Sequence, residues 1–166
     1  RPESVLDRIA PGERLLIDTS VVLAYLTGTE ATSQAATDLF DGGIANGRYA
    51  AVLSAISVAE LLVRPFGRGP GTVATIEGFL RHFGDVRVAE VTYDIAREGA
   101  RLRAATGLAM PDALIIATAV VERIDRIVTN DVAWRGRLTD HLPDVALLCL
   151  ADESATRSDG HGRPAG

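Results

Sequence analysis

The sequence predicts an α/β fold in which a small parallel β-sheet of four or five strands is flanked by helices on both faces. Three observations lead to this prediction. Short apolar runs alternate along the chain with longer segments of helical periodicity. The apolar runs are nearly continuous, as expected for strands that are covered on both faces. Hydrophobic residues make up 47% of the 166 residues, enough for a sizeable core.

Five runs rich in Val, Ile, Leu and Ala are predicted to be strands, because their length and composition suit buried strands better than helices. In chain order they are RLLID (14–18), AAVLSA (50–55), VRVAEV (86–91), RIVTN (126–130) and VALLCL (145–150). Ligand sites in such sheets lie beyond the carboxyl ends of the strands. The polar residues that close these runs are therefore candidate site residues.

The segments between the strands are predicted to be helical. They cover 20–26, about 31–45, 57–66, 72–83, 94–106, 111–123 and a short piece around Trp134. Gly107 is expected to stop the fifth helix, and Pro111 suits the first position of the sixth. Pro65 is expected to end the third helix, with GRGPG (67–71) as a loop.

The length suits one domain, which we place at 14–150, with 1–13 as an N-terminal extension. The polar tail, 151–166, is rich in Gly, Ser and Asp and is expected to be disordered. The longest apolar run, 113–121, is half the length that spans a bilayer, and no secretory leader opens the sequence. The single cysteine, Cys149, excludes an internal disulfide and suits a reducing cytoplasm. We therefore expect a cytoplasmic protein with no membrane association.

All 17 basic residues are arginine, which excludes several functions. A Walker A loop and Schiff-base chemistry both need a lysine. Phosphotransfer enzymes of the haloacid-dehalogenase type and response-regulator receivers need one as well. The net charge of −5 does not attract nucleic acid, so a polyanionic partner needs a local arginine patch or a metal ion.

Four carboxylates stand at positions typical of a site, although each has an ordinary structural explanation. Asp18 closes the first strand and could cap the next helix, and Asp131 could cap the helix after the fourth strand. Glu60 could close a capping box with Ser57. Asp112 lies in the first turn of a very apolar helix, where a negative charge favours the helix dipole.

Their joint placement favours a metal site. The first and fourth strands are expected to be neighbours, which would bring Asp18 and Asp131 together, along with Thr129 and Asn130. Two carboxylates about 4 Å apart repel by about 4 kcal/mol at an effective dielectric constant near 20. Oxygen ligands select Mg²⁺ or Mn²⁺ rather than zinc, and the three histidines show no metal-binding spacing. Such sites act on phosphate, which points to phosphodiester hydrolysis.

Four motifs carry a resemblance to a known family: LLIDTSVVLAYL, SAISVAELL, MPDALIIATAV and IVTND. In order and spacing they resemble the motifs of PIN-domain ribonucleases, specifically the VapC toxin branch of bacterial toxin–antitoxin pairs. The resemblance runs from about Leu15 to Leu150. It implies the PIN fold, in which Asp112 reaches the carboxyl edge of the sheet.

The resemblance also implies a site and a reaction. Asp18, Glu60, Asp112 and Asp131 match the family's acidic residues, and hydroxyls at Thr19 or Ser20 and at Thr129 match residues that support metal-bound water. The implied activity is Mg²⁺- or Mn²⁺-dependent cleavage of single-stranded or structured RNA. TNDVAW lacks the second acidic residue that often follows this motif, so one tightly held ion is expected.

Partners follow from the resemblance and from the charge pattern. The family implies a small VapB-like antitoxin, a homodimer, and a heterotetramer or larger assembly with the antitoxin. Arg64 and Arg68 flank Pro65 and could contact RNA phosphates. The apolar surface of 20–26 and of the helix ending near Leu39 and Phe40 suggests a protein-binding face, or else a tightly packed core. The alternative function is a catalytically silent PIN-like module that binds RNA or protein.

Overall fold

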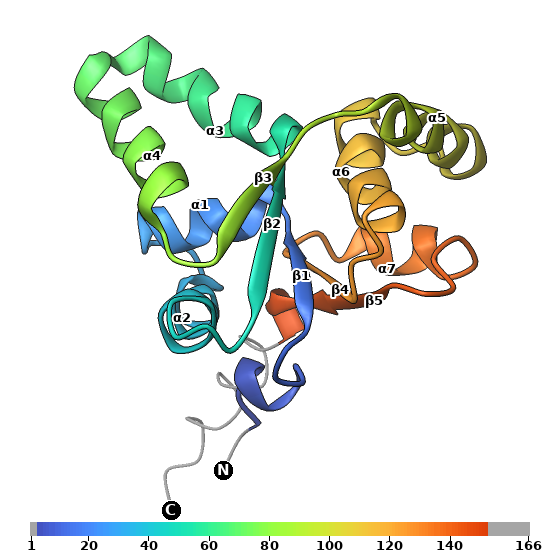
Figure 1. The fold of residues 1–166 in the computed structure, drawn as a ribbon, viewed down its shortest axis with the longest axis horizontal. Coiled ribbons are helices and arrows are strands. Elements are labelled where there is room, and N and C mark those ends of the chain that lie inside the picture. Colours follow the sequence, from blue (N-terminus) through green and yellow to red (C-terminus); the bar gives the residue numbers. More distant parts are fainter. Residues whose placement is uncertain (1–2, 153–166) are drawn as a thin grey trace, which may run out of the picture.

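The computed structural model describes residues 3–152 and confirms the predicted fold class. Five strands form one parallel sheet in this part of the chain, in the order β3-β2-β1-β4-β5 (Figure 1). The strands are β1 (Arg14–Ile17), β2 (Ala50–Ser54), β3 (Val86–Ala89), β4 (Arg126–Thr129) and β5 (Ala146–Cys149). The tail prediction falls largely outside the described residues.

Strand β1 lies at the centre of the sheet and is the point where the winding changes direction. It pairs with β2 on one side, where Leu15 is opposite Ala51, and with β4 on the other, where Ile17 is opposite Val128. The backbone N–H of Asp18 continues the pairing by donating to Val128 O at 2.9 Å. The predicted adjacency of the first and fourth strands is therefore confirmed.

Helices cover both faces of the sheet (Figure 1). They are α1 (Thr19–Thr27), α2 (Ser33–Leu39), α3 (Ala55–Arg68), α4 (Pro70–His82), α5 (Tyr93–Thr106), α6 (Met110–Val121) and α7 (Ala133–Leu138), with a 3-10 turn at Val5–Asp7 and a π-helical turn at Phe40–Ile44. The core has two apolar clusters, one between the sheet and α1 and α2, the other between the sheet and α5, α6 and α7. None of the helices within residues 3–152 is long and apolar enough to cross a bilayer.

The predicted end of the third helix at Pro65 is wrong. Helix α3 continues through Pro65 to Arg68, and only Gly69, with φ +122°, separates it from α4. Pro65 cannot donate the backbone hydrogen bond to Leu61 O, but its ring is buried. Packing of α3 against α4 therefore outweighs one missing hydrogen bond.

Most of the apolar surface of the first helices is buried. Val21, Val22, Leu39 and Phe40 are fully buried, as the alternative of a tightly packed core expects, but Leu23 is 37% exposed. Two of the most exposed large apolar side chains in the described chain instead lie on α3. They are Val63 and Phe66, each about 70% exposed.

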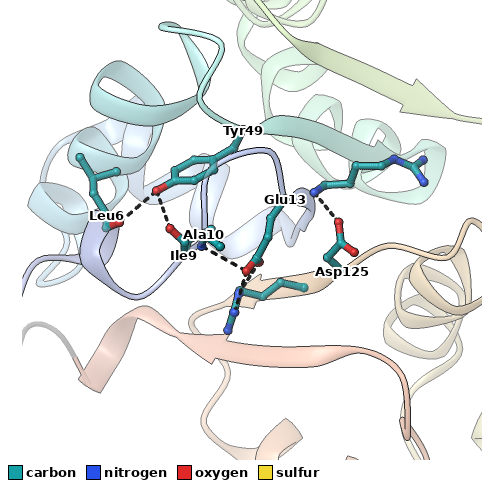
Figure 2. Close-up of polar contacts among 8 residues, drawn as sticks. Leu6, Ile9, Ala10, Glu13, Tyr49 and Asp125 are labelled. Atoms are coloured by element: carbon teal, nitrogen blue, oxygen red, sulfur yellow. Dashed lines mark hydrogen bonds and ion pairs between the residues drawn. The ribbon is translucent and has the colours of Figure 1, made fainter.

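The segment before β1 packs into the domain. Val5 and Ile9 are buried in the core cluster that also contains α1 and α2. The Tyr49 hydroxyl, at the start of β2, lies 3.1 Å from both Leu6 O and Ile9 O (Figure 2). Glu13 accepts two hydrogen bonds from Arg126 of β4 at 2.8 and 3.1 Å. These contacts tie the segment to the amino-terminal edge of the sheet.

Candidate active site

All four candidate carboxylates line one cavity of about 830 Å³ at the carboxyl edge of the sheet. Asp18 follows β1, Glu60 lies in the second turn of α3, Asp112 lies in the first turn of α6 and Asp131 follows β4. Residues from four separate segments of the sequence thus meet in one place. Arg64 and Arg68, predicted to contact RNA, line the same cavity.

Asp18 is the most buried of the four, with 6% of its surface exposed. It stands at the N-cap of α1, but its side chain makes no capping hydrogen bond. Its Oδ2 instead accepts hydrogen bonds from Ser20 Oγ and Thr129 Oγ1, each at 2.8 Å. Burial raises the pKa of Asp18 to about 6, against these two hydrogen bonds, and the charge of Asp112 adds to the increase.

Glu60 points toward α1 and not back along its own helix. Its Oε2 accepts a hydrogen bond from Thr19 Oγ1 at 2.5 Å. The capping-box interpretation with Ser57 is wrong, because Ser54 caps α3 by accepting from Ile56 N. Ser57 lies inside the helix, and its buried hydroxyl has no hydrogen-bond partner among the described residues.

The loop after β4 connects the two central strands at the site. Asn130 N donates to Ser20 Oγ, and Asn130 Nδ2 donates to Ser20 O, both at 3.2 Å. Asp131 N donates to Thr129 Oγ1 at 3.0 Å, and Asp131 Oδ1 accepts from Ala133 N at 2.9 Å. Val132, and not Asp131, is the N-cap of α7, although the Asp131 side chain still binds the first N–H of that helix. The other carboxylate oxygen of Asp131 is left for other partners.

Asp112 is half-buried in the cavity wall. Burial is the main cause that raises its pKa, followed by the negative charges of Glu60 and Asp131. The Trp134 side chain, which sequence reasoning left without a role, lowers this pKa and lines the same cavity. The only signal in the sequence was proximity, because Trp134 is the single tryptophan and follows Asp131 by three positions.

The donor set fits a hard divalent cation. Only carboxylate and hydroxyl oxygens come together around Asp18, and such ligands suit Mg²⁺ or Mn²⁺. Within residues 3–152, no ion pair joins any of the four carboxylates to an arginine, so their repulsion is not relieved internally. In the same range no group of three or more acidic, His or Cys side chains is already arranged to hold an ion. An ion could be held here only if these side chains turned toward one another.

Comparison with protein-family models matches residues 15–136 to the PIN domain, a range that begins within β1 and ends within α7. The chain belongs to the PIN-domain family. This confirms the resemblance that the four motifs carry. A comparison with curated protein sequences finds no match.

Solved PIN-domain structures share this fold. VapBC-1 from nontypeable Haemophilus influenzae has a TM-score of 0.60 at 18% identity, covering 83% of this chain and 98% of that one. A toxin–antitoxin complex from Klebsiella pneumoniae has a TM-score of 0.54 at 20% identity, covering 80% and 95%. VapC20 from Mycobacterium tuberculosis, a toxin that cleaves the sarcin–ricin loop, has a TM-score of 0.56 at 20% identity, covering 68% and 86%.

The PIN fold explains how Asp112 reaches the site, which the pattern of residues alone left open. Helices α5 and α6 pack together on one face of the sheet (Figure 1), and the first turn of α6 contributes Asp112 to the cavity wall. Asp112 therefore lines the same space as Asp18, although 94 positions separate them.

Proposed function

We propose that this protein is a Mg²⁺- or Mn²⁺-dependent endoribonuclease and the toxin of a toxin–antitoxin pair. One observation carries the proposal: carboxylates from four separate segments share one cavity, and within residues 3–152 no arginine pairs with any of them. Such an arrangement is costly in a domain of marginal stability unless a cation or protons relieve it. Membership of the PIN-domain family supports the nuclease assignment.

Asp18 and Asp112 would hold the ion, and Glu60 and Asp131 would complete the site. When bound, a divalent ion supplies an activated water and stabilises the charge that develops on the phosphate. The chain's own hydroxyls orient the ligands: Ser20 and Thr129 fix one oxygen of Asp18, and Thr19 fixes one oxygen of Glu60.

RNA would enter over the α3 side of the cavity. Arg64 and Arg68 lie on the wall that α3 contributes, where their guanidinium groups can contact backbone phosphates. Two arginines line the cavity and the net charge is −5, so binding should be weak and should fall with added salt by the small slope that two phosphate contacts give.

The proposed protein partner is a small VapB-like antitoxin. The support is twofold: solved structures with the same fold are VapBC complexes, and α3 exposes Val63 and Phe66 beside the cavity. An apolar segment of the antitoxin would cover this surface of α3. A homodimer, and a heterotetramer or larger assembly with the antitoxin, complete the proposal.

Cleavage assays with Asp112→Asn test the proposed function. We expect wild-type protein to cut RNA with Mg²⁺ or Mn²⁺, to stop in EDTA and to recover when the ion is returned. Asp112→Asn should lose cleavage while remaining folded. Asp94→Asn is a matched control, because Asp94 also lies in the first turn of a helix but is exposed and does not line the cavity. Full activity in chelator, or in Asp112→Asn, would contradict the proposal.

Calorimetric titration distinguishes the nuclease from a catalytically silent module that uses the same fold. A nuclease should bind Mn²⁺ specifically and lose that binding in Asp18→Asn. A silent module should show no specific Mn²⁺ binding and no cleavage, even though it retains affinity for RNA or protein.

A further inference from the structure

The indole of Trp134 is a buried hydrogen-bond donor without an acceptor. Trp134 is 1% exposed, and its Nε1 has no hydrogen-bond partner among the described residues. A buried donor without a partner destabilises the fold, and most buried polar groups in proteins avoid this state. Its presence in the wall of the candidate site therefore calls for a functional explanation.

The packing of Trp134 fixes the direction of this donor. Its ring belongs to the apolar cluster between the sheet and α5, α6 and α7, where Ile115, Ile116 and Leu138 are also fully buried or nearly so. Its backbone N–H donates to Asp131 O at 3.3 Å, which ties the start of α7 to the loop that carries Asp131. The indole cannot turn away without disturbing this cluster.

Asp112 lacks the kind of partner that its neighbours have. Asp18 accepts from two hydroxyls, Glu60 from Thr19, and Asp131 from the backbone of α7. Within residues 3–152, no hydrogen bond of ordinary length and angle reaches Asp112, although the Trp134 side chain already acts on it as a hydrogen-bond donor and lowers its pKa. A donor and a carboxylate thus line the same cavity, and within residues 3–152 neither makes a well-formed hydrogen bond.

We propose that Trp134 is the positioning residue for Asp112: its indole N–H donates to the Asp112 carboxylate when the four acidic side chains draw together around a divalent ion. This inference rests on the proposed function. Both side chains already line the same cavity, so the contact needs no change of the fold. Partners of this kind orient a ligand and limit its rotamers.

NMR tests the contact directly, because Trp134 is the only tryptophan in the chain. Protein labelled with ¹⁵N-tryptophan should give one indole N–H peak for the folded state. We expect its proton resonance to move downfield when Mg²⁺ is added, and the movement to be lost in Asp112→Asn. A peak that responds to Mg²⁺ equally in wild type and Asp112→Asn would overturn the inference.

The Trp134→Phe variant tests the consequence, because it removes the N–H and keeps an aromatic ring. We expect kcat for RNA cleavage and the affinity for Mg²⁺ to fall by roughly tenfold or more, with KM for RNA little changed. The melting temperature should change little, because an unpartnered buried donor is removed with the indole. A wild-type kcat in Trp134→Phe would overturn the inference.

Leu39→Ala is the control for a purely structural effect. Leu39 is buried on α2 in the other apolar cluster, away from Trp134, and does not line the cavity. Its truncation should lower the melting temperature while kcat, measured well below that temperature, stays at the wild-type value. If wild-type protein cuts no RNA at all, the proposed function fails, whereas the NMR experiment on Trp134 and Asp112 still decides the contact.

Discussion

At the scale of single residues, the candidate site is a set of acidic side chains held by hydroxyls. Asp18 is nearly inaccessible to water and accepts from Ser20 and Thr129, but these neutral donors do not cancel its charge. Desolvation dominates, so the pKa of Asp18 is raised and not lowered. The metal-free fold therefore bears a cost whenever this carboxyl is ionised.

That cost predicts an unusual pH dependence. The pKa of Asp18 is about 6 in the folded protein, against an ordinary value of 3.8. Between these values the folded state binds more protons than the unfolded state, so stability decreases as pH rises from about 4 to about 6. The full difference is about 3 kcal/mol. Chemical denaturation in EDTA across this range should show the decrease.

Asp18→Asn isolates this effect from the other titrating groups. The free energy of unfolding of the variant should lack the contribution from Asp18 ionisation. The difference in this free energy between wild type and variant should therefore change with pH and level off above about pH 7. A constant difference across the range would show that Asp18 is not ionising as described. Saturating Mg²⁺ should reduce the dependence in wild type, because a bound ion favours the carboxylate.

At the scale of secondary-structure elements, backbone constraints predict opposite effects for two glycines. Gly107 ends α5 with φ +70°, and Gly78 lies inside α4; an added Cβ would meet nothing within 4 Å at either position. Gly107→Ala should lower the free energy of unfolding by about 1 kcal/mol, because the left-handed conformation is strained for alanine. Gly78→Ala should raise it by about 0.5–1 kcal/mol. Thermal or urea unfolding of both variants measures the two changes in the free energy of unfolding. Changes of the same sign would contradict the prediction.

Sequence patterns predicted the elements well where local chemistry decides them. Gly107 ends its helix as expected, and the five strands lie where the apolar runs predicted them. The prediction failed at Pro65 and Ser57, where the deciding influence is not local. Packing against α4 keeps α3 helical past Pro65, and Ser54, three residues earlier, takes the capping position assigned to Ser57.

At the scale of the whole molecule, the site depends on how distant segments meet. Residues that close strands could be placed from sequence, because the neighbouring strands β1 and β4 bring Asp18 and Asp131 to one edge. Asp112 could not be placed by periodicity, since its position depends on how α6 packs against the sheet. The apolar residues of the N-terminal segment likewise gave no indication that they complete the core.

The N-terminal segment and the candidate site lie at opposite edges of the sheet, so stability and activity should be separable. Deleting residues up to Ala10 removes the buried Val5 and Ile9 and both acceptors of the Tyr49 hydroxyl. Because burying each aliphatic side chain contributes about 1.5–3 kcal/mol, the free energy of unfolding should fall by at least about 3 kcal/mol. Tyr49→Phe, which loses only the hydrogen bonds, should cost about 1 kcal/mol. Urea denaturation measures both, while RNA cleavage well below the unfolding transition should persist. A truncated protein as stable as the full chain would mean that the segment is not part of the core.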